Sequence, residues 1–159
     1  MKVAVIGGGS TYTPELVNGF LQRAESFPLR ELWLMDVDAE RLRVVGGFAQ
    51  RMVFKIFLTT NRREALQGAS YVTTQLRVGM MPARRNDEYL GKRHGLIGQE
   101  TTGVGGMAKA LRTIPVILDI ANDMRELAPN AMLANFTNPA GIVTQALSQY
   151  APDILAVGV

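Results

Sequence analysis

Short apolar segments alternate with longer amphipathic segments along the chain. The apolar segments predict strands at residues 2–6, 32–35, 56–60, 71–76, 131–136 and 154–159. The amphipathic segments predict helices at 13–25, 39–53, 107–127 and 142–150, with a short helical turn at 64–67. Strands that are apolar throughout are typical of a parallel sheet covered on both faces. The pattern therefore predicts an α/β fold, a Rossmann-like doubly wound parallel sheet of about six strands with helices on both faces.

Local signals refine the boundaries of these elements. Thr13 is suited to cap the first helix, and Pro14 suits its first position. Pro115 predicts a bend in the helix at 107–127. The segment 77–106 is the longest without a regular pattern, and it predicts a long loop, functional or disordered, with a helical turn at 87–93.

Composition narrows the class of protein. The 159 residues are enough for about one domain, and the absence of cysteine excludes a disulfide framework, a thiolate metal site and a cysteine nucleophile within these residues. The 17 basic residues exceed the 14 acidic ones only slightly and are scattered, so we expect no nucleic-acid partner. The apolar run at residues 3–6 is too short for a secretory signal or a membrane span, so we expect a cytoplasmic protein with no membrane partner.

A glycine-rich turn, Gly7-Gly8-Gly9-Ser10, follows the first predicted strand and precedes the first predicted helix. Glycine lets the backbone turn sharply, and the amides and dipole of a helix start attract anions. Gly7 and Gly9 fill the first two places of the G-x-G-x-x-G dinucleotide fingerprint, while Tyr12 stands where the third glycine belongs. We predict that Gly7, Gly9 and Ser10 hold the diphosphate of a dinucleotide; the alternative is an ordinary tight turn.

Asp36 ends the second predicted strand, where an acid can accept hydrogen bonds from the adenosine ribose and favour NAD over NADP. Its separation from Gly9 exceeds the roughly 20 residues of the fingerprint, but the intervening helix and loop can absorb the difference. The alternative is that Asp36 or Asp38 caps the helix that starts at residue 39. We assign Asp38 to the cap and Asp36 to the ribose.

Three polar segments, at 84–88, 98–106 and 135–139, are expected near the carboxyl ends of the strands. Arg84 could hold a phosphate or carboxylate, or could lie in a solvated charged turn. The glycines around Glu100 suggest backbone close to a ligand, or a merely flexible loop. Asn138 precedes a proline, which favours an extended backbone that could aim the Asn138 side chain at a ligand. Asn138 could equally cap a helix.

His94 is the only histidine, so neither a histidine metal pair nor a Ser-His-Asp triad is indicated.

Together these segments resemble glycoside hydrolase family 4, and within it most closely the 6-phospho-β-glucosidases. The matching segments are 5–16 (VIGGGSTYTPEL), 84–88 (RRNDE), 95–103 (GLIGQETTG) and 135–139 (NFTNP). The family's enzymes are larger, so the resemblance covers their N-terminal part. It implies that residues 1–159 are the NAD-binding Rossmann domain of a longer protein whose catalytic and substrate domain is absent here.

The resemblance implies an unusual route for glycoside hydrolysis. NAD⁺ takes a hydride from C3 of the sugar, and the ketone acidifies the C2 proton, which a tyrosine removes. A divalent metal, usually manganese, polarises the oxygens at C2 and C3, which stabilises the negative charge that forms. Elimination, addition of water and return of the hydride complete the reaction.

Residue roles follow from the same resemblance. Gly7, Gly9, Ser10 and Asp36 match the NAD contacts. Arg84 matches the arginine at the sugar phosphate, Asn138 a substrate-contacting asparagine, and Glu100 an acid that raises the basicity of the catalytic tyrosine. The expected substrate is a phosphorylated disaccharide or an aryl 6-phospho-β-glucoside, and the whole enzyme is expected to be a homo-oligomer.

The chain also departs from the family pattern. The family's metal-binding cysteine falls just after Val159, and its metal-binding histidine and tyrosine base come later. We therefore expect no metal ligand within these residues and no hydrolysis of p-nitrophenyl 6-phospho-β-glucoside by this chain alone.

Two alternatives remain beside this interpretation. A dehydrogenase of the lactate or malate type shares the nucleotide turn, and a non-catalytic NAD-sensing module would stay inert even when the missing part is restored. The run GQETTG at 98–103 favours the glycosidase. Related members act on 6-phospho-α-glucosides, α-galactosides or glucuronides, whereas Arg84 and the segment STYTPEL at 10–16 favour phosphorylated β-glucosides.

Overall fold

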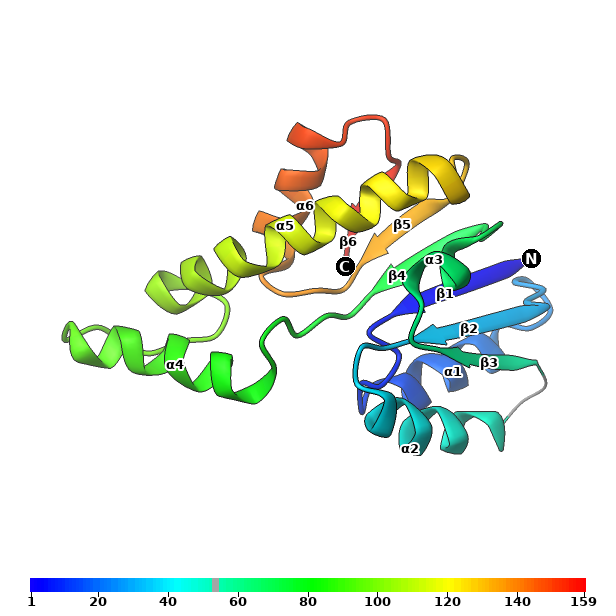
Figure 1. The fold of residues 1–159 in the computed structure, drawn as a ribbon, viewed down its shortest axis with the longest axis horizontal. Helices are drawn as coiled ribbons and strands as arrows, with labels where there is room; N and C mark the ends of the chain where they lie inside the picture. Colours follow the sequence, from blue (N-terminus) through cyan, green and yellow to red (C-terminus); the bar gives the residue numbers. More distant parts are fainter. Residues whose placement is uncertain (53–54) are drawn as a thin grey trace.

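The computed structural model describes residues 1–52 and 55–159, so the predicted end of the second helix at Val53 lies outside the described residues. The elements, labelled in Figure 1, are β1 (Lys2–Ile6), α1 (Thr13–Gln22), β2 (Glu31–Met35), α2 (Ala39–Gln50), β3 (Ile56–Thr59), α3 (Arg62–Leu66), β4 (Tyr71–Thr74), α4 (Met80–Arg93), α5 (Gly103–Leu127), β5 (Met132–Asn135), α6 (Ala140–Tyr150) and β6 (Ala156–Gly158).

The strands form one sheet in the order β3-β2-β1-β4-β5-β6, and every neighbouring pair is parallel. The order reverses between β1 and β4, which makes their carboxyl ends the topological switch point of a doubly wound sheet. The Rossmann-like fold predicted from the sequence is confirmed. Each strand lies within two residues of its predicted bounds.

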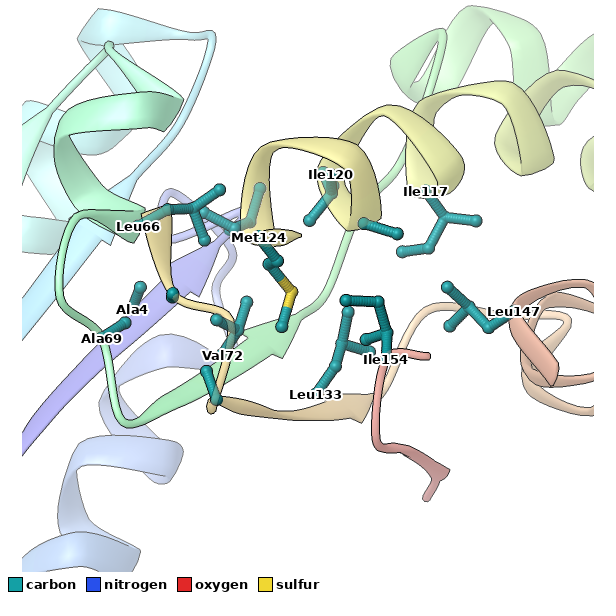
Figure 2. Close-up of a cluster of buried hydrophobic side chains, with 14 of the residues drawn as sticks. Ala4, Leu66, Ala69, Val72, Ile117, Ile120, Met124, Leu133, Leu147 and Ile154 are labelled. Carbon is teal, nitrogen blue, oxygen red and sulfur yellow. The ribbon is translucent and has the colours of Figure 1, made fainter. Parts of the chain in front are cut away.

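Strand β1, in the middle of the sheet, buries side chains on both faces because successive residues point to opposite sides of a sheet. Val3 and Val5 lie in a cluster with residues of α1 and α2, whereas Ala4 and Ile6 lie in one with residues of α3, α5 and α6. Figure 2 shows the second cluster, with Ile117, Ile120 and Met124 of α5 pointing toward the sheet. These three side chains are fully buried, and each such burial stabilises the fold by about 1.5–3 kcal/mol.

The start of α1 differs from the prediction. Thr13 is the first residue of the helix, and Tyr12 occupies the cap position without a side-chain cap bond. The Thr13 hydroxyl is buried and donates to the carbonyl oxygen of Gly8 at 2.9 Å, so it secures the preceding turn instead. Pro14 stands in the first turn of the helix as predicted.

The segment 77–106 is mostly helical, and its prediction as a long loop was wrong. The 14-residue α4 contains the predicted turn at 87–93, and α5 begins four residues earlier than predicted, at Gly103. Figure 1 shows α4 and the first half of α5 projecting side by side from the sheet. We call this pair the α4–α5 arm. Helix α5 continues through Pro115, and a bend there stays a prediction.

Candidate functional site

The glycine turn lies at the carboxyl end of β1, between β2 and β4. The amides of Gly7 and Gly8 both donate to the carbonyl oxygen of Met35, at 2.9 and 2.8 Å. Gly7 has a φ of 98°, and a Cβ there would lie 2.6 Å from the carbonyl oxygen of Gln75. The sequence therefore needs glycine at this position both for the backbone angle and for the close approach of β4.

The start of α1 retains capacity for an anion. Within the described part of the chain, the amides of Thr11 and Glu15 have no hydrogen-bond acceptor, and Pro14 has no amide hydrogen. The Ser10 hydroxyl oxygen accepts from the Tyr12 amide at 3.2 Å, which leaves the Ser10 hydroxyl proton free to donate. Unpaired amides at a helix N-terminus, together with the helix dipole, suit the diphosphate of a dinucleotide.

Asp36 is joined directly to this turn. Its Oδ2 accepts from the Gly9 amide at 2.8 Å, and its Oδ1 accepts from the Asp38 amide at 3.0 Å. Each carboxylate oxygen can accept a second hydrogen bond, so capacity remains for a ribose hydroxyl. Asp38 instead accepts from the Arg41 amide at 3.0 Å and caps α2, which confirms the assignment of the cap.

Gln75, directly after β4, braces the turn from the other side. Its Nε2 donates to the carbonyl oxygen of Gly7 at 3.0 Å and to the Thr13 hydroxyl at 2.8 Å. Its Oε1 is buried and has no donor partner among the described residues. Free amides, a charged acceptor and an unpaired amide oxygen together fit a dinucleotide with its hydroxyl-bearing riboses. The sequence analysis did not single out Gln75 as a site residue. The one sequence feature that could have indicated it is its position directly after a predicted strand.

A second cluster, of charged side chains, surrounds Glu100. Its Oε1 accepts from Lys109 Nζ at 2.7 Å and from Arg77 Nη1, and its Oε2 lies 3.2 Å from Arg84 Nη1. Arg84 also donates through Nε to Glu88 at 2.9 Å. Arg84 and Glu100, both predicted as site residues, are thus brought together. Arg84 lies on helix α4 and not in a turn, and its side chain is 36% exposed, so a role in holding an anion stays a prediction.

The cluster fixes the protonation state of its carboxyl group. Burial raises the pKa of Glu100, but hydrogen bonds and positive charges from Lys109 and Arg77 outweigh it, so the pKa lies below its usual value. The pKa of Arg84 is raised, chiefly by its hydrogen bond to Glu88. Three cations around Glu100 leave an excess of positive charge for an anionic ligand. The sequence analysis missed Arg77 and Lys109, although Lys109 is one of only two charged residues on the buried face of α5.

A neighbouring ion pair holds α4 on α5. Arg112 reaches both oxygens of Asp87, at 3.1 and 2.6 Å, and its Nε donates to the carbonyl oxygen of Val78. The glycines of the 98–106 segment allow close contacts within the chain itself: a Cβ on Gly105 would collide with the carbonyl oxygen of Gln99. The alternative of a merely flexible loop is therefore not needed to explain these glycines.

The segment after β5 carries Asn138. Asn135 is buried and accepts from the Thr74 hydroxyl at 3.0 Å and from the Thr137 amide at 3.1 Å, which fixes the start of this segment. Asn138 is exposed, and the cap position of α6 is Pro139, which forms no side-chain cap bond. The predicted alternative of a cap by Asn138 is wrong, and a ligand contact by Asn138 stays a prediction.

The residues described contain no group of three or more histidine, cysteine, aspartate or glutamate side chains that could hold a metal ion. His94 is exposed at the end of α4. In the same residues, none of the helices combines the length and the apolar character that crossing a membrane requires.

Comparison with known proteins agrees with this geometry. The model of the family described as family 4 glycosyl hydrolase matches residues 2–159. The chain belongs to this family. It is 56% identical over 158 residues to a probable 6-phospho-β-glucosidase of Bacillus subtilis and 52% identical over 158 residues to a 6-phospho-β-glucosidase of Escherichia coli. Each alignment covers 94% of this chain but only 36% and 35% of the relatives, so the family 4 chain spans about a third of their length.

Solved structures give the same result. The family 4 chain superposes on the 6-phospho-β-glucosidase of Thermotoga maritima with NAD and glucose-6-phosphate at a TM-score of 0.96 and 41% identity, covering 100% of this chain and 39% of that one. A 6-phospho-α-glucosidase from gut microorganisms in complex with NAD and Mn²⁺ gives a TM-score of 0.93 and 36% identity, covering 99% and 38%. A lactate dehydrogenase of Eimeria maxima gives 0.58 at 14% identity, a likeness of fold alone.

Proposed function

We propose that the chain is the dinucleotide-binding part, residues 1–159, of an NAD- and divalent-metal-dependent 6-phospho-β-glucosidase. The observation that carries this proposal is the 2.8 Å contact between the Gly9 amide and the Asp36 carboxylate. It sets a charged acceptor beside an anion-binding turn at the switch point of the sheet, where such folds bind dinucleotides. Gly7, Gly9 and Ser10 then face the diphosphate.

The chain's own residues orient the ligands. Asp36 accepts from the adenosine ribose, and Arg84, positioned by Glu100 and Glu88, attracts the phosphate of the sugar. Asn138 contacts the substrate beside the cofactor. When bound, NAD supplies a hydride acceptor, and the divalent metal, whose ligands we expect outside these residues, supplies a Lewis acid.

The β-glucoside substrate is supported by the identity to 6-phospho-β-glucosidases, at 41–56%, which exceeds the identity to 6-phospho-α-glucosidases, at 32–39%. The dehydrogenase alternative is not favoured, because that likeness is one of fold at 14% identity. The proposal has further parts. The substrate is a phosphorylated disaccharide or an aryl 6-phospho-β-glucoside, and the whole enzyme is a cytoplasmic homo-oligomer. These residues alone are inactive.

Isothermal titration of the chain with NAD⁺ and NADP⁺ tests the cofactor assignment. The Asp36 carboxylate repels a 2′-phosphate, so we expect NAD⁺ to bind at least about tenfold more tightly, a difference of about 1.4 kcal/mol. Asp36→Ala should weaken NAD⁺ and bring the NADP⁺/NAD⁺ ratio of dissociation constants close to one.

Asp38→Ala is the matched control, because it removes a carboxylate two residues away that caps α2 and does not contact the turn. Its NADP⁺/NAD⁺ ratio should stay at the wild-type value. If Asp36→Ala weakened both coenzymes equally, the carboxylate would act only by holding the Gly9 amide, and the ribose assignment would be wrong. Absence of any NAD⁺ binding to the wild-type chain would refute the proposed function.

A further inference from the structure

Two aromatic rings stack across the carboxyl edge of the sheet. The ring centroids of Tyr12 and Phe136 are 4.9 Å apart, with 21° between the ring planes. Tyr12 belongs to the turn after β1, and Phe136 directly follows β5. Since β4 lies between β1 and β5, the pair bridges the end of β4.

Both rings are held in place yet remain open to solvent. The Phe136 amide donates to the carbonyl oxygen of Thr74 at 2.9 Å, and the Tyr12 amide donates to the Ser10 hydroxyl. Tyr12 is nevertheless 39% exposed and Phe136 38% exposed. A fixed, exposed aromatic surface beside a polar turn has the character of a binding wall, because its apolar area is available for a ligand to cover.

A dinucleotide bound across the sheet edge would extend over the Tyr12–Phe136 pair. Asp36 marks the adenosine ribose beyond β2, and the glycine turn marks the diphosphate at the end of β1. The other half of the molecule must then continue over β4 toward β5, since a dinucleotide lies across the switch point. The Tyr12–Phe136 pair stands on that side of the turn.

We propose that the Tyr12–Phe136 pair forms an aromatic wall that binds the nicotinamide half of the dinucleotide, an inference that rests on the proposed function. The nicotinamide ring of NAD⁺ is flat and positively charged. The faces of phenyl and phenol rings attract such a ring through stacking and cation–π interaction. Tyr12, which replaces the third glycine of the fingerprint, is therefore a positioning residue for the cofactor.

Isothermal titration with NAD⁺ and ADP-ribose tests the proposal, because ADP-ribose lacks only the nicotinamide ring. Phe136→Leu keeps an apolar side chain but removes the ring. We expect it to weaken NAD⁺ about five- to tenfold and to change ADP-ribose affinity by less than about twofold. Unchanged ADP-ribose binding also shows that the variant is folded. Tyr12→Leu should behave in the same way.

The chain contains a matched control pair. Phe57 stacks on Trp33 at 4.7 Å and 21° and is 38% exposed, but it lies within β3 and not at the carboxyl edge. Phe57→Leu should leave both affinities at their wild-type values.

The outcomes separate the two proposals. If ADP-ribose binds the wild-type chain but Phe136→Leu leaves NAD⁺ affinity unchanged, or increases it, the aromatic wall is refuted while the proposed function stands. Equal weakening of both ligands would make the pair a support of the turn and would also refute it. If neither ligand binds the wild-type chain, both proposals fail.

Discussion

Replacing Glu100 with glutamine tests the electrostatics of the α4–α5 arm. The substitution keeps the size of the side chain but removes the one carboxylate that Arg77, Arg84 and Lys109 share. The Lys109 side chain is only 6% exposed, so its ammonium group would remain in the protein without a counter-charge. Three neighbouring cations would then repel one another.

The size of the effect follows from the exposure of the partners. Removing one partner of a fully buried ion pair costs about 3–5 kcal/mol. The side chains of Glu100, Arg77 and Arg84 are 21%, 34% and 36% exposed, so water screens part of this penalty. We expect Glu100→Gln to lower the free energy of unfolding by about 2–3 kcal/mol, which corresponds to a melting temperature lower by about 5–10 °C.

Lys109→Met is the matched control. Methionine fills the buried volume with apolar atoms, and Glu100 keeps Arg77 and Arg84 as partners. Its cost should be below about 1 kcal/mol, because a paired charge is replaced without leaving another one buried and alone. Urea unfolding followed by circular dichroism measures both variants. Equal costs for the two substitutions, or less than about 0.5 kcal/mol for Glu100→Gln, would refute the reasoning.

The pH dependence gives a second test of the same prediction. Burial alone would raise the pKa of Glu100, but Lys109 and Arg77 lower it below its ordinary value of 4.5. A carboxyl group with a lowered pKa stabilises the fold above its ordinary pKa and loses this contribution as the pH falls through the lowered value. The stability difference between wild type and Glu100→Gln should therefore be constant near neutral pH and should shrink as the pH falls through the lowered pKa of Glu100.

Two further predictions concern the glycine turn and the far end of α5. Gly7→Ala should lower the free energy of unfolding in urea by about 1–3 kcal/mol, because φ is 98° and the new Cβ meets the Gln75 carbonyl oxygen. The control Gly19→Ala lies in a helix with open space around the new Cβ and should stabilise the fold. An unchanged stability in Gly7→Ala would contradict the turn geometry. The hydrogen bond from Arg125 lowers the pKa of Asp153 to about 2, so an NMR titration should show that midpoint, and Arg125→Met should return it to near 3.8. The Asp153 contribution to stability is present above pH 3.8 and lost as the pH falls through 2, and an unchanged midpoint in Arg125→Met would show that the ion pair does not form.

The centre of the sheet was predictable from the sequence because β1 buries side chains on both faces. Such a strand must be apolar at every position, as Val3, Ala4 and Val5 are, and the signal needs no knowledge of distant contacts. The cap of α2 was predictable for the same reason: Asp38 acts on an amide three residues away.

Helix α4 was not predictable in this way, because it packs against α5 and lies away from the sheet. Only Asp87 and Gly91 are buried in it, so it lacks the apolar stripe that marks a helix in a sequence. Its position depends on the ion pair between Asp87 and Arg112, residues far apart in the chain. A helix held by long-range charges on one neighbour looks like a polar loop until the fold is known.

The candidate site was predictable in part, and its connections were not. Glycine spacing marked the turn, yet nothing in the spacing shows that the segment after β4 contacts both clusters. Gln75 donates to the turn through the Gly7 carbonyl oxygen, and two residues later Arg77 reaches Glu100. The same short segment therefore braces the dinucleotide turn and supplies one cation to the anion-attracting cluster. The first contact arises because β1 and β4 are neighbours and bring their carboxyl ends to one edge, and the second arises because the segment between α4 and α5 returns to that edge; both follow from the arrangement of the elements in space and not from their order in the chain.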